Sequence, residues 1–434
     1  MVDTASLEQW LVRLERLHPN PIDLGLERVA SVALNLQLLP VSVPVVTVAG
    51  TNGKGSTVAV LEAILGGAGK CTGVYTSPHL LRFNERIRVG GVDASDGEII
   101  AAFREVDDAR GDTSLTYFEF ATLAALLVFR TRAVDVLVLE VGLGGRLDAV
   151  NIVDPTVAVI TRIDLDHQAW LGPDRGSIGR EKAGILRRGV PAVLGDPEPP
   201  AELVDAVVAS AAQPVLRLGH EFGFETRGDH WQGTLRGPDG VPRVLPELPR
   251  GALKPANICT GLQAALLVGC EMSDAQVVAA VAAARPRGRC ERLSIAGRDY
   301  VLDVAHNPAA TYNLIEFLSA TPCKGKTIAI FSVMADKDIC GMIAAAVGSF
   351  DAWFVADQPA NARAAAGEDV AALLRAGGAA MISVSKNLRQ ALRRAQSVMA
   401  EGDRLVVFGS FHTVAGVLLL LDRDNGETGR GSRT

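Results

Sequence analysis

The sequence predicts an α/β chain of two domains: a larger one built on a mostly parallel sheet, followed by a smaller, Rossmann-like α/β domain. Its 434 residues exceed what one hydrophobic core usually organises. Short β-branched runs alternate with helical segments, a pattern typical of a parallel sheet covered on both faces. A second such series follows a basic, turn-rich segment near Pro286. We therefore expect domains at 1–286 and 287–422, and a flexible tail at 423–434.

In the first domain, the apolar residues of the N-terminal segment recur at helical spacing, so an amphipathic helix is expected there. This set is Leu7, Trp10, Leu11, Leu14 and Leu17. Strands are predicted at 45–49, 73–76, 134–140 and 157–160, with helices at 54–68 and 118–130. The segment 213–250 is rich in glycine, proline and turn residues and predicts an irregular β excursion.

In the second domain, strands are predicted at 300–304, 327–331, 353–355, 381–384 and 404–408, with helices between them. The residues from 422 onward lack apolar content, which is why we expect a tail there.

Composition excludes several classes of protein. A net charge of −6 argues against a nucleic-acid partner, because binding to a phosphate backbone relies on clustered lysine and arginine. No apolar run is long enough to span a bilayer, so no membrane association is expected. The six cysteines are scattered without a metal-binding spacing and are expected to be reduced thiols, as in the cytoplasm. No heptad or long apolar stripe suggests self-association, so a monomer is expected.

The segment VVTVAGTNGKGSTVAVLEAIL is a β-branched strand, a glycine-rich turn and a helix. In such a turn the backbone N–H groups converge on phosphate oxygens, and the helix N-terminus adds a favourable dipole. Lys54 supplies a charge for the β and γ phosphates of ATP, which makes the first domain P-loop ATPase-like. Ser56 comes one residue later than the Ser/Thr of the ordinary pattern. The expected nucleotide contacts are Thr51, Asn52, Gly53, Lys54, Gly55 and Ser56.

Polar residues that follow neighbouring strands suggest a metal site. Glu140 ends an apolar strand, Ser77 follows the 73–76 strand, and His167 comes after the 157–160 strand. Because the carboxyl ends of parallel strands share one edge of a sheet, these side chains can converge there. Carboxylate and hydroxyl oxygens suit a hard cation. Singly, each also has a structural interpretation, as a solvated charge, a turn residue or a loop imidazole, and Lys182 alone is typical of a surface charge.

A series of motifs in order along the chain carries a resemblance to a known family. They are GTNGKGS, TSPHL, NERI, LTYFEFAT, LEVGLGGRLDAVNIVD, DHQAWLG, SIGREKAGI, DVAHNP, DKD and FGSFH. Together they resemble folylpolyglutamate synthase/dihydrofolate synthase, a branch of the Mur ligase family, from Gly50 to His412. One departure is Cys290, where relatives commonly carry an aromatic residue.

The resemblance implies an ATP- and Mg²⁺-dependent ligase. It matches Ser77, Glu140 and His167 to magnesium ligands at two metal sites, and Lys182 to a lysine that carbon dioxide converts to a carbamate. Further positions that match nucleotide contacts are Asn257, Arg289 and Asp303. Catalytic roles are implied for Lys54, His167 and Lys182, and domain closure around ATP is expected.

The same resemblance implies the substrates: dihydropteroate, folates, L-glutamate and ATP. A substrate carboxylate is expected to take the γ-phosphate and then lose it to the amine of glutamate. The implied substrate contacts are Thr116, Tyr117, Phe118, Glu119, Leu147, Asp148, Ala149 and His306, the last with the 410–412 run near glutamate or nucleotide. Two other classes stay open at this point: a Mur-type ligase acting on a cell-wall precursor, and a nucleotide-binding protein without ligase chemistry.

Overall fold

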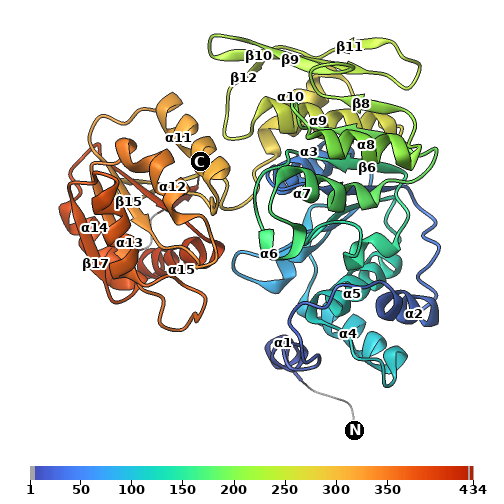
Figure 1. Cartoon of the computed structure of the whole chain (residues 1–434), viewed down its shortest axis with the longest axis horizontal. Helices are drawn as coiled ribbons and strands as arrows, with labels where there is room; N and C mark the ends of the chain where they lie inside the picture. The colour runs from blue at the N-terminus through green and yellow to red at the C-terminus, as the bar shows by residue number, and fades with distance from the viewer. Residues whose placement is uncertain (1–4, 429–430, 434) are drawn as a thin grey trace. The chain divides into compact units, whose positions relative to one another are not determined.

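The computed structural model describes residues 5–428 and 431–433, with side chains through residue 423. The chain divides into two compact units, Met1–Ala284 and Arg285–Thr434, each with its own sheet (Figure 1). Among the described residues, no helix is both long and apolar enough to cross a membrane.

The first unit is built on an eight-stranded sheet in the order β4-β3-β2-β5-β1-β6-β7-β8. Strands β2, β5, β1, β6, β7 and β8 are parallel, whereas β3 and β4 extend one side by antiparallel pairing. The strands are β1 Val45–Ala49, β2 Thr72–Tyr75, β3 Ile87–Val89, β4 Val92–Asp93, β5 Val136–Glu140, β6 Val157–Ile160, β7 Ala192–Leu194 and β8 Val215–Arg217. The predicted parallel sheet and its central strands are confirmed.

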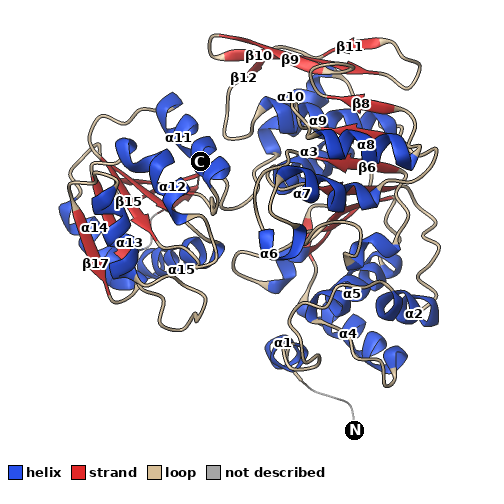
Figure 2. Cartoon of the chain, in the orientation of Figure 1, coloured by secondary structure: helices blue, strands red, loops and turns tan. Residues whose placement is uncertain are grey.

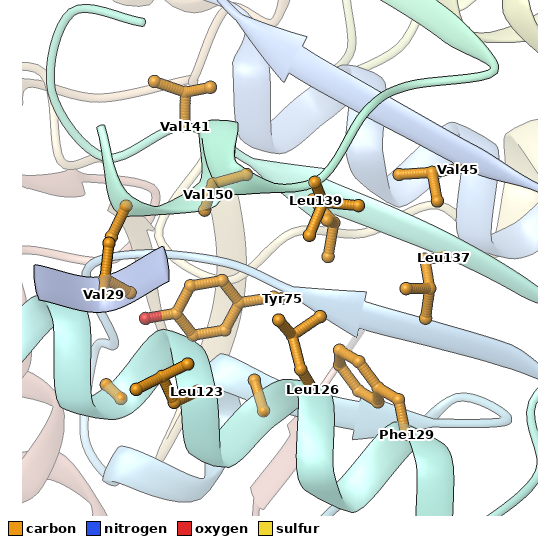
Figure 3. Close-up of a cluster of buried hydrophobic side chains, with 14 of the residues drawn as sticks. Val29, Val45, Tyr75, Leu123, Leu126, Phe129, Leu137, Leu139, Val141 and Val150 are labelled. Carbon is orange, nitrogen blue, oxygen red and sulfur yellow. The ribbon is translucent and has the colours of Figure 1, made fainter. Parts of the chain in front are cut away.

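Alternating residues of the central strands bury two separate cores, because successive side chains of a strand point to opposite faces. Leu137 and Leu139 of β5 pack with Tyr75 and helix α5 (Tyr117–Thr131) on one face (Figure 3). Val136 and Val138 of the same strand pack on the other face, with helices α3 (Lys54–Gly67) and α9 (Pro255–Leu267). This two-sided cover explains why the strands are apolar throughout.

The helices of the first unit cover both faces of the sheet (Figure 2). The predicted N-terminal helix is present as α1 and buries Leu7, Trp10 and Leu14, but it ends at Leu14, so Leu17 of the predicted set lies beyond it. The helices are α1 Leu7–Leu14, α2 Glu27–Asn35, α3 Lys54–Gly67, α4 Asp96–Arg110, α5 Tyr117–Thr131, α6 Gln168–Leu171, α7 Arg175–Lys182, α8 Ala201–Ser210, α9 Pro255–Leu267 and α10 Asp274–Ala283.

The predicted β excursion is a small antiparallel sheet that packs on α9 through Trp231 and Leu245. Its strands are β9 Gly223–Arg227, β10 His230–Arg236, β11 Pro242–Val244 and β12 Leu248–Pro249. The first strand of the predicted segment, β8, joins the main sheet instead.

The second unit contains a sheet in the order β17-β16-β15-β18-β14-β13-β19. All five predicted strands are present, and β13 is an additional strand that pairs antiparallel with β14. The strands are β13 Glu291–Ile295, β14 Arg298–Leu302, β15 Thr327–Phe331, β16 Ala352–Ala356, β17 Ile382–Ser385, β18 Arg404–Phe408 and β19 Gly431–Arg433.

Helices connect these strands, as expected for a Rossmann-like unit. They are α11 Pro308–Ala320, α12 Ile339–Ala346, α13 Gly367–Ala376, α14 Leu388–Val398 and α15 Phe411–Thr428. Helix α15 continues into the segment 423–434, for which we expected a flexible tail; residues 429, 430 and 434 of that segment lie outside the described residues.

Candidate active site

Four adjacent parallel strands end at the same edge of the first sheet and carry the predicted site. Strand β5 lies between β2 and β1, and β6 lies on the other side of β1. Glu140 is the last residue of β5 and pairs in register with Val48, just before the glycine-rich turn. This arrangement places the turns after β1 and β2 next to the end of β5, and the turn after β6 beside the turn after β1.

Ser77 and Glu140 come together at this edge. The backbone N–H of Ser77 donates to the Glu140 Oε2 atom at 3.4 Å. Glu140 is only 5% exposed, so its carboxylate is held in a largely desolvated place. The buried carboxylate and the hydroxyl of the neighbouring serine supply oxygen donors, which suit a hard cation.

The glycine-rich turn forms a compact loop. The Lys54 ammonium donates to the carbonyl oxygens of Gly50 and Thr51 at 3.0 and 3.3 Å, so its charge rests on the loop itself. Gly53 has φ +98°, and a Cβ there would lie 2.5 Å from the Asn257 Oδ1 atom of helix α9. Asn257, which the resemblance matches to a nucleotide contact, therefore lies against this turn.

Gly55 and Ser56, on the first turn of helix α3, differ in their surroundings. A Cβ at Gly55 would meet no atom of the described structure within 4 Å, so space is open over this part of the backbone. Ser56 is buried, with 9% exposure, on the first turn of α3.

Two aspartates that were not predicted follow strand β6, and the first of them, Asp164, supports this loop. Asp164 accepts from the Asn52 amide at 3.2 Å, and its backbone oxygen accepts from the Thr51 hydroxyl at 3.0 Å. Asp166 accepts from the His167 backbone N–H at 2.8 Å. The signal was an aspartate pair at i and i+2 directly after a buried strand, in TRIDLDH.

His167 and Lys182 both lie near Asp166, and Lys182 also lies near Lys54 of the loop. The His167 Nε2 atom lies 3.9 Å from the Asp166 carboxylate, and its side chain is 42% exposed. Lys182, the last residue of α7, is buried. Burial, together with the nearby charge of Lys54, lowers the pKa of Lys182 to about 7, and Asp166 partly opposes this shift. These four residues therefore share one electrostatic environment.

Within the part of the chain that the structure describes, no three His, Cys, Asp or Glu side chains form a metal-binding group. The predicted ligand set differs from such a group because it relies on a serine hydroxyl and a modified lysine in addition to Glu140 and His167.

Phe118 and Asp148 meet on the same side of the sheet. The Phe118 ring lies 5.9 Å from the Tyr75 ring. A Cβ at Gly142 would lie 2.7 Å from Phe118 Cζ and 3.3 Å from Asp148 Oδ2, so this glycine allows the two to approach. Burial raises the pKa of Asp148 to about 6, although backbone N–H groups, including those of Leu143 and Val150, oppose this.

The remaining predicted substrate residues of the first unit lie at the start of helix α5, beside Phe118, or next to Asp148 in the chain. Thr116 and Glu119 form the capping box of α5, and Glu119 also accepts from Arg28 at 3.1 Å. Tyr117 lies under the guanidinium of Arg86, 5.4 Å from its ring centre. Leu147 is half-buried, and Ala149 begins a short 3₁₀ helix, Ala149–Ile152.

The predicted residues of the second unit gather where β14 and β18 end. Asp303 accepts from Cys290 N and Sγ at 2.8 and 3.3 Å. Burial raises the pKa of Asp303, and the nearby Arg289 guanidinium opposes this. Arg289 lies over the Phe411 ring at 5.6 Å, and the His306 ring lies 6.1 Å from it.

Two family descriptions match this chain: the Mur ligase middle domain over residues 48–194 and the Mur ligase glutamate ligase domain over residues 288–411. The dihydrofolate synthase/folylpolyglutamate synthase of Escherichia coli K12 is 43% identical over 423 residues, which are 96% of each chain. The chain belongs to this branch of the Mur ligase family.

Solved structures of the family agree with this assignment. E. coli FolC in complex with DHPP and ADP superimposes with a TM-score of 0.91 at 41% identity, covering 97% of this chain and 99% of that one. A bifunctional folylpolyglutamate synthase/dihydrofolate synthase with Mn, AMPPNP and L-glutamate bound gives a TM-score of 0.88 at 42% identity, covering 96% of this chain and 98% of that one.

Proposed function

We propose that this chain is an ATP-dependent carboxylate–amine ligase that joins L-glutamate to dihydropteroate and to tetrahydrofolates through an acyl phosphate. The observation that carries the proposal is the 43% sequence identity to the E. coli dihydrofolate synthase/folylpolyglutamate synthase, over 96% of both chains. The glycine-rich loop, Glu140 and Ser77 at one sheet edge support it. In this proposal residues 1–286 form the ATP-binding and catalytic domain, and 287–422 the glutamate ligase domain.

The phosphates of ATP would take over contacts that the loop now makes with itself. The Lys54 ammonium rests on two carbonyl oxygens at 3.0 and 3.3 Å, and a triphosphate offers it a stronger, anionic partner. The open space over Gly55 lets phosphate approach the backbone. The loop would therefore hold the γ-phosphate while the substrate carboxylate attacks it.

The donor set of the sheet edge fits magnesium. Ser77 and the buried Glu140 carboxylate would hold one ion, and His167 with a modified Lys182 the other. When bound, Mg²⁺ offsets the repulsion between the phosphate and the attacking carboxylate. The protein's own part is to orient these anions and, on closure, to exclude the water that would hydrolyse an acyl phosphate.

Lys182 is proposed to carry the carbamate. With a pKa of about 7, much of its amine is neutral at physiological pH and can attack carbon dioxide. A nitrogen–carbon bond forms as one carbon–oxygen double bond of carbon dioxide becomes single, one proton leaves the nitrogen, and the neutral amine becomes an anionic carbamate whose oxygens can bind a metal. We expect a carbamate signal in ¹³C NMR after equilibration with ¹³CO₂, absent in Lys182→Ala. Short carboxylates should partly restore the activity of that variant; a fully active enzyme with unmodified Lys182 would contradict the role.

The flat pterin ring is proposed to stack on Phe118, with polar contacts to the loop from Leu147 to Ala149. Asp148 is well placed for this because its Oδ2 atom lies beside Gly142, close to the Phe118 ring. His306 and the 410–412 run of the second unit are proposed to contact glutamate or nucleotide.

A product analysis tests the proposed function. The protein is incubated with dihydropteroate or tetrahydrofolate, glutamate and ATP·Mg²⁺, omitting each in turn. We expect ADP, phosphate and the glutamyl amide in equal amounts, and none of them when any substrate is missing. Ligation of a muramyl precursor instead, or stoichiometric ATP binding without amide, would overturn the proposal. Light scattering tests the expected monomer.

A further inference from the structure

A small cavity lies in the second unit, at the end of the sheet opposite to Asp303. Strands β14 and β18 are parallel, and the cavity lies where both begin, at Asp299 and Arg404, whereas Asp303 follows the end of β14. Its volume is about 90 Å³, and its polar lining includes Arg292, Ser294, Asp299, Thr321, Cys323 and Arg404. It is therefore distinct from the residues that the proposed ligation uses.

Arg404 is a buried cation in this lining. It is 8% exposed and donates to carbonyl oxygens at the C-terminal end of helix α11, those of Leu318 and Thr321, and to the Thr327 hydroxyl at 3.1 Å. The negative end of the helix dipole explains why the guanidinium is tolerated here. Its Nε atom is buried without a hydrogen-bond partner in the described structure. No carboxylate of the described residues forms an ion pair with it.

A second arginine faces the same cavity. Arg292 pairs with Val301 and Ser294 pairs with Asp299 across β13 and β14, and Asp299 pairs with Arg404 across β14 and β18. Residues in register lie on the same face of a sheet, so both guanidinium groups and the Ser294 hydroxyl share that face. Arg292 is close enough to lower the pKa of Arg404, secondary to burial. In the part of the chain that the structure describes, Arg292 has no ion pair.

We propose that this cavity binds a small tetrahedral oxyanion such as inorganic phosphate. The volume, about 90 Å³, exceeds the roughly 10–15 Å³ that one water molecule needs on the same measure, which leaves room for such an ion. The Arg292 guanidinium can bind phosphate oxygens through paired N–H donors, and Ser294 adds a hydroxyl, whereas Arg404, whose terminal nitrogens already donate to protein oxygens, contributes its positive charge. Two like charges that otherwise repel each other gain a shared counter-ion.

Asp299 allows a direct test of which ligand binds, because its side chain lines the cavity and is exposed. Its carboxylate repels a bound oxyanion, so removing its charge should strengthen binding. A zwitterionic ligand, such as a free amino acid, would instead use Asp299 to hold its ammonium group. The sign of the effect of Asp299→Asn therefore distinguishes the two kinds of ligand.

Calorimetric titration with inorganic phosphate tests the site. The full chain is first saturated with AMPPNP and Mg²⁺, so that the glycine-rich loop does not take up the added phosphate. We expect saturable binding at one site, about tenfold weaker in Arg292→Ala. The matched control is Arg298→Ala, an arginine of β14 outside the cavity lining, which should leave the affinity unchanged. Asp299→Asn should bind severalfold more tightly, and sulfate should displace phosphate.

Three results would overturn the proposal: no saturable phosphate binding, equal losses in Arg292→Ala and Arg298→Ala, or weaker binding in Asp299→Asn. Arg404→Met should also abolish binding, but Arg404 is buried and this variant risks misfolding. The test therefore rests on Arg292 and Asp299, which are exposed and whose replacement should leave the fold intact.

Discussion

Gly53→Ala tests whether the glycine-rich loop binds nucleotide or is only a structural turn. Gly53 has φ +98°, a left-handed conformation that costs a residue with a Cβ about 1–2 kcal/mol. The new Cβ would also lie 2.5 Å from Asn257 Oδ1 and 3.1 Å from its Cγ, so the Asn257 amide or the loop has to move.

The backbone strain should mainly lower the stability of the fold, whereas the displacement of the loop should mainly lower nucleotide affinity. Stability should decrease by about 1–2 kcal/mol, because the strain belongs to a single residue. Nucleotide affinity should decrease much more, by roughly 100-fold, since a displacement of about 1 Å in a phosphate-binding loop disrupts several contacts at once. The change in affinity therefore exceeds what the change in stability explains.

A matched control lies on the helix that follows the loop. Gly66 lies near the end of α3, has helical geometry and is exposed. A Cβ added at this position would meet no atom within 4 Å. Gly66→Ala should stabilise the protein by about 0.5–1 kcal/mol and leave nucleotide binding unchanged. Urea unfolding and fluorescence titration with a labelled ATP analogue give both quantities. Equal nucleotide affinities in Gly53→Ala and Gly66→Ala would refute the reasoning.

Three further changes test other parts of the molecule. Lys54→Ala should remove nearly all ATP-dependent ligation with an unchanged circular dichroism spectrum, and near-normal turnover would exclude its phosphate role. Thr116→Ala should cost about 1 kcal/mol in urea unfolding, because the capping box of α5 is lost. Asp148 has a pKa of about 6 in the folded protein, against an ordinary 3.8, so the folded state binds more protons between these values. Stability relative to Asp148→Asn should therefore be greatest below pH 4 and fall by roughly 3 kcal/mol as the pH rises to about 7; a flat difference would contradict the buried carboxyl.

The sheet strands were the most predictable part of the fold. The 45–49, 157–160, 327–331 and 404–408 predictions match β1, β6, β15 and β18 residue for residue, because these β-branched runs are buried on both faces. Strand β13 was missed because Glu291 and Arg292 continue a basic, turn-rich segment that we interpreted as a linker. Its pairing with β14 is a tertiary contact that local sequence does not encode.

Among the site residues, the contacts between the ends of parallel strands could be predicted from the sequence, whereas the contacts that depend on helix packing could not. Ser77 and Glu140 were expected to meet because each follows a parallel strand, and the structure places them 3.4 Å apart. The link from His167 to Lys182 through Asp166 was not predicted, since it depends on how α7 packs against the loop after β6. Likewise, the contact between Asn257 and Gly53 needs α9 to lie beside α3, which the motifs alone do not specify.

The most direct measurement of the central claim is an anomalous-scattering map of a crystal grown with Mn²⁺ and AMPPNP. We predict a manganese peak within coordination distance of Ser77 Oγ and the Glu140 carboxylate, with the nucleotide phosphates on the Lys54 ammonium. Manganese peaks only at other places, with Glu140 pointing away from the triphosphate, would contradict the account.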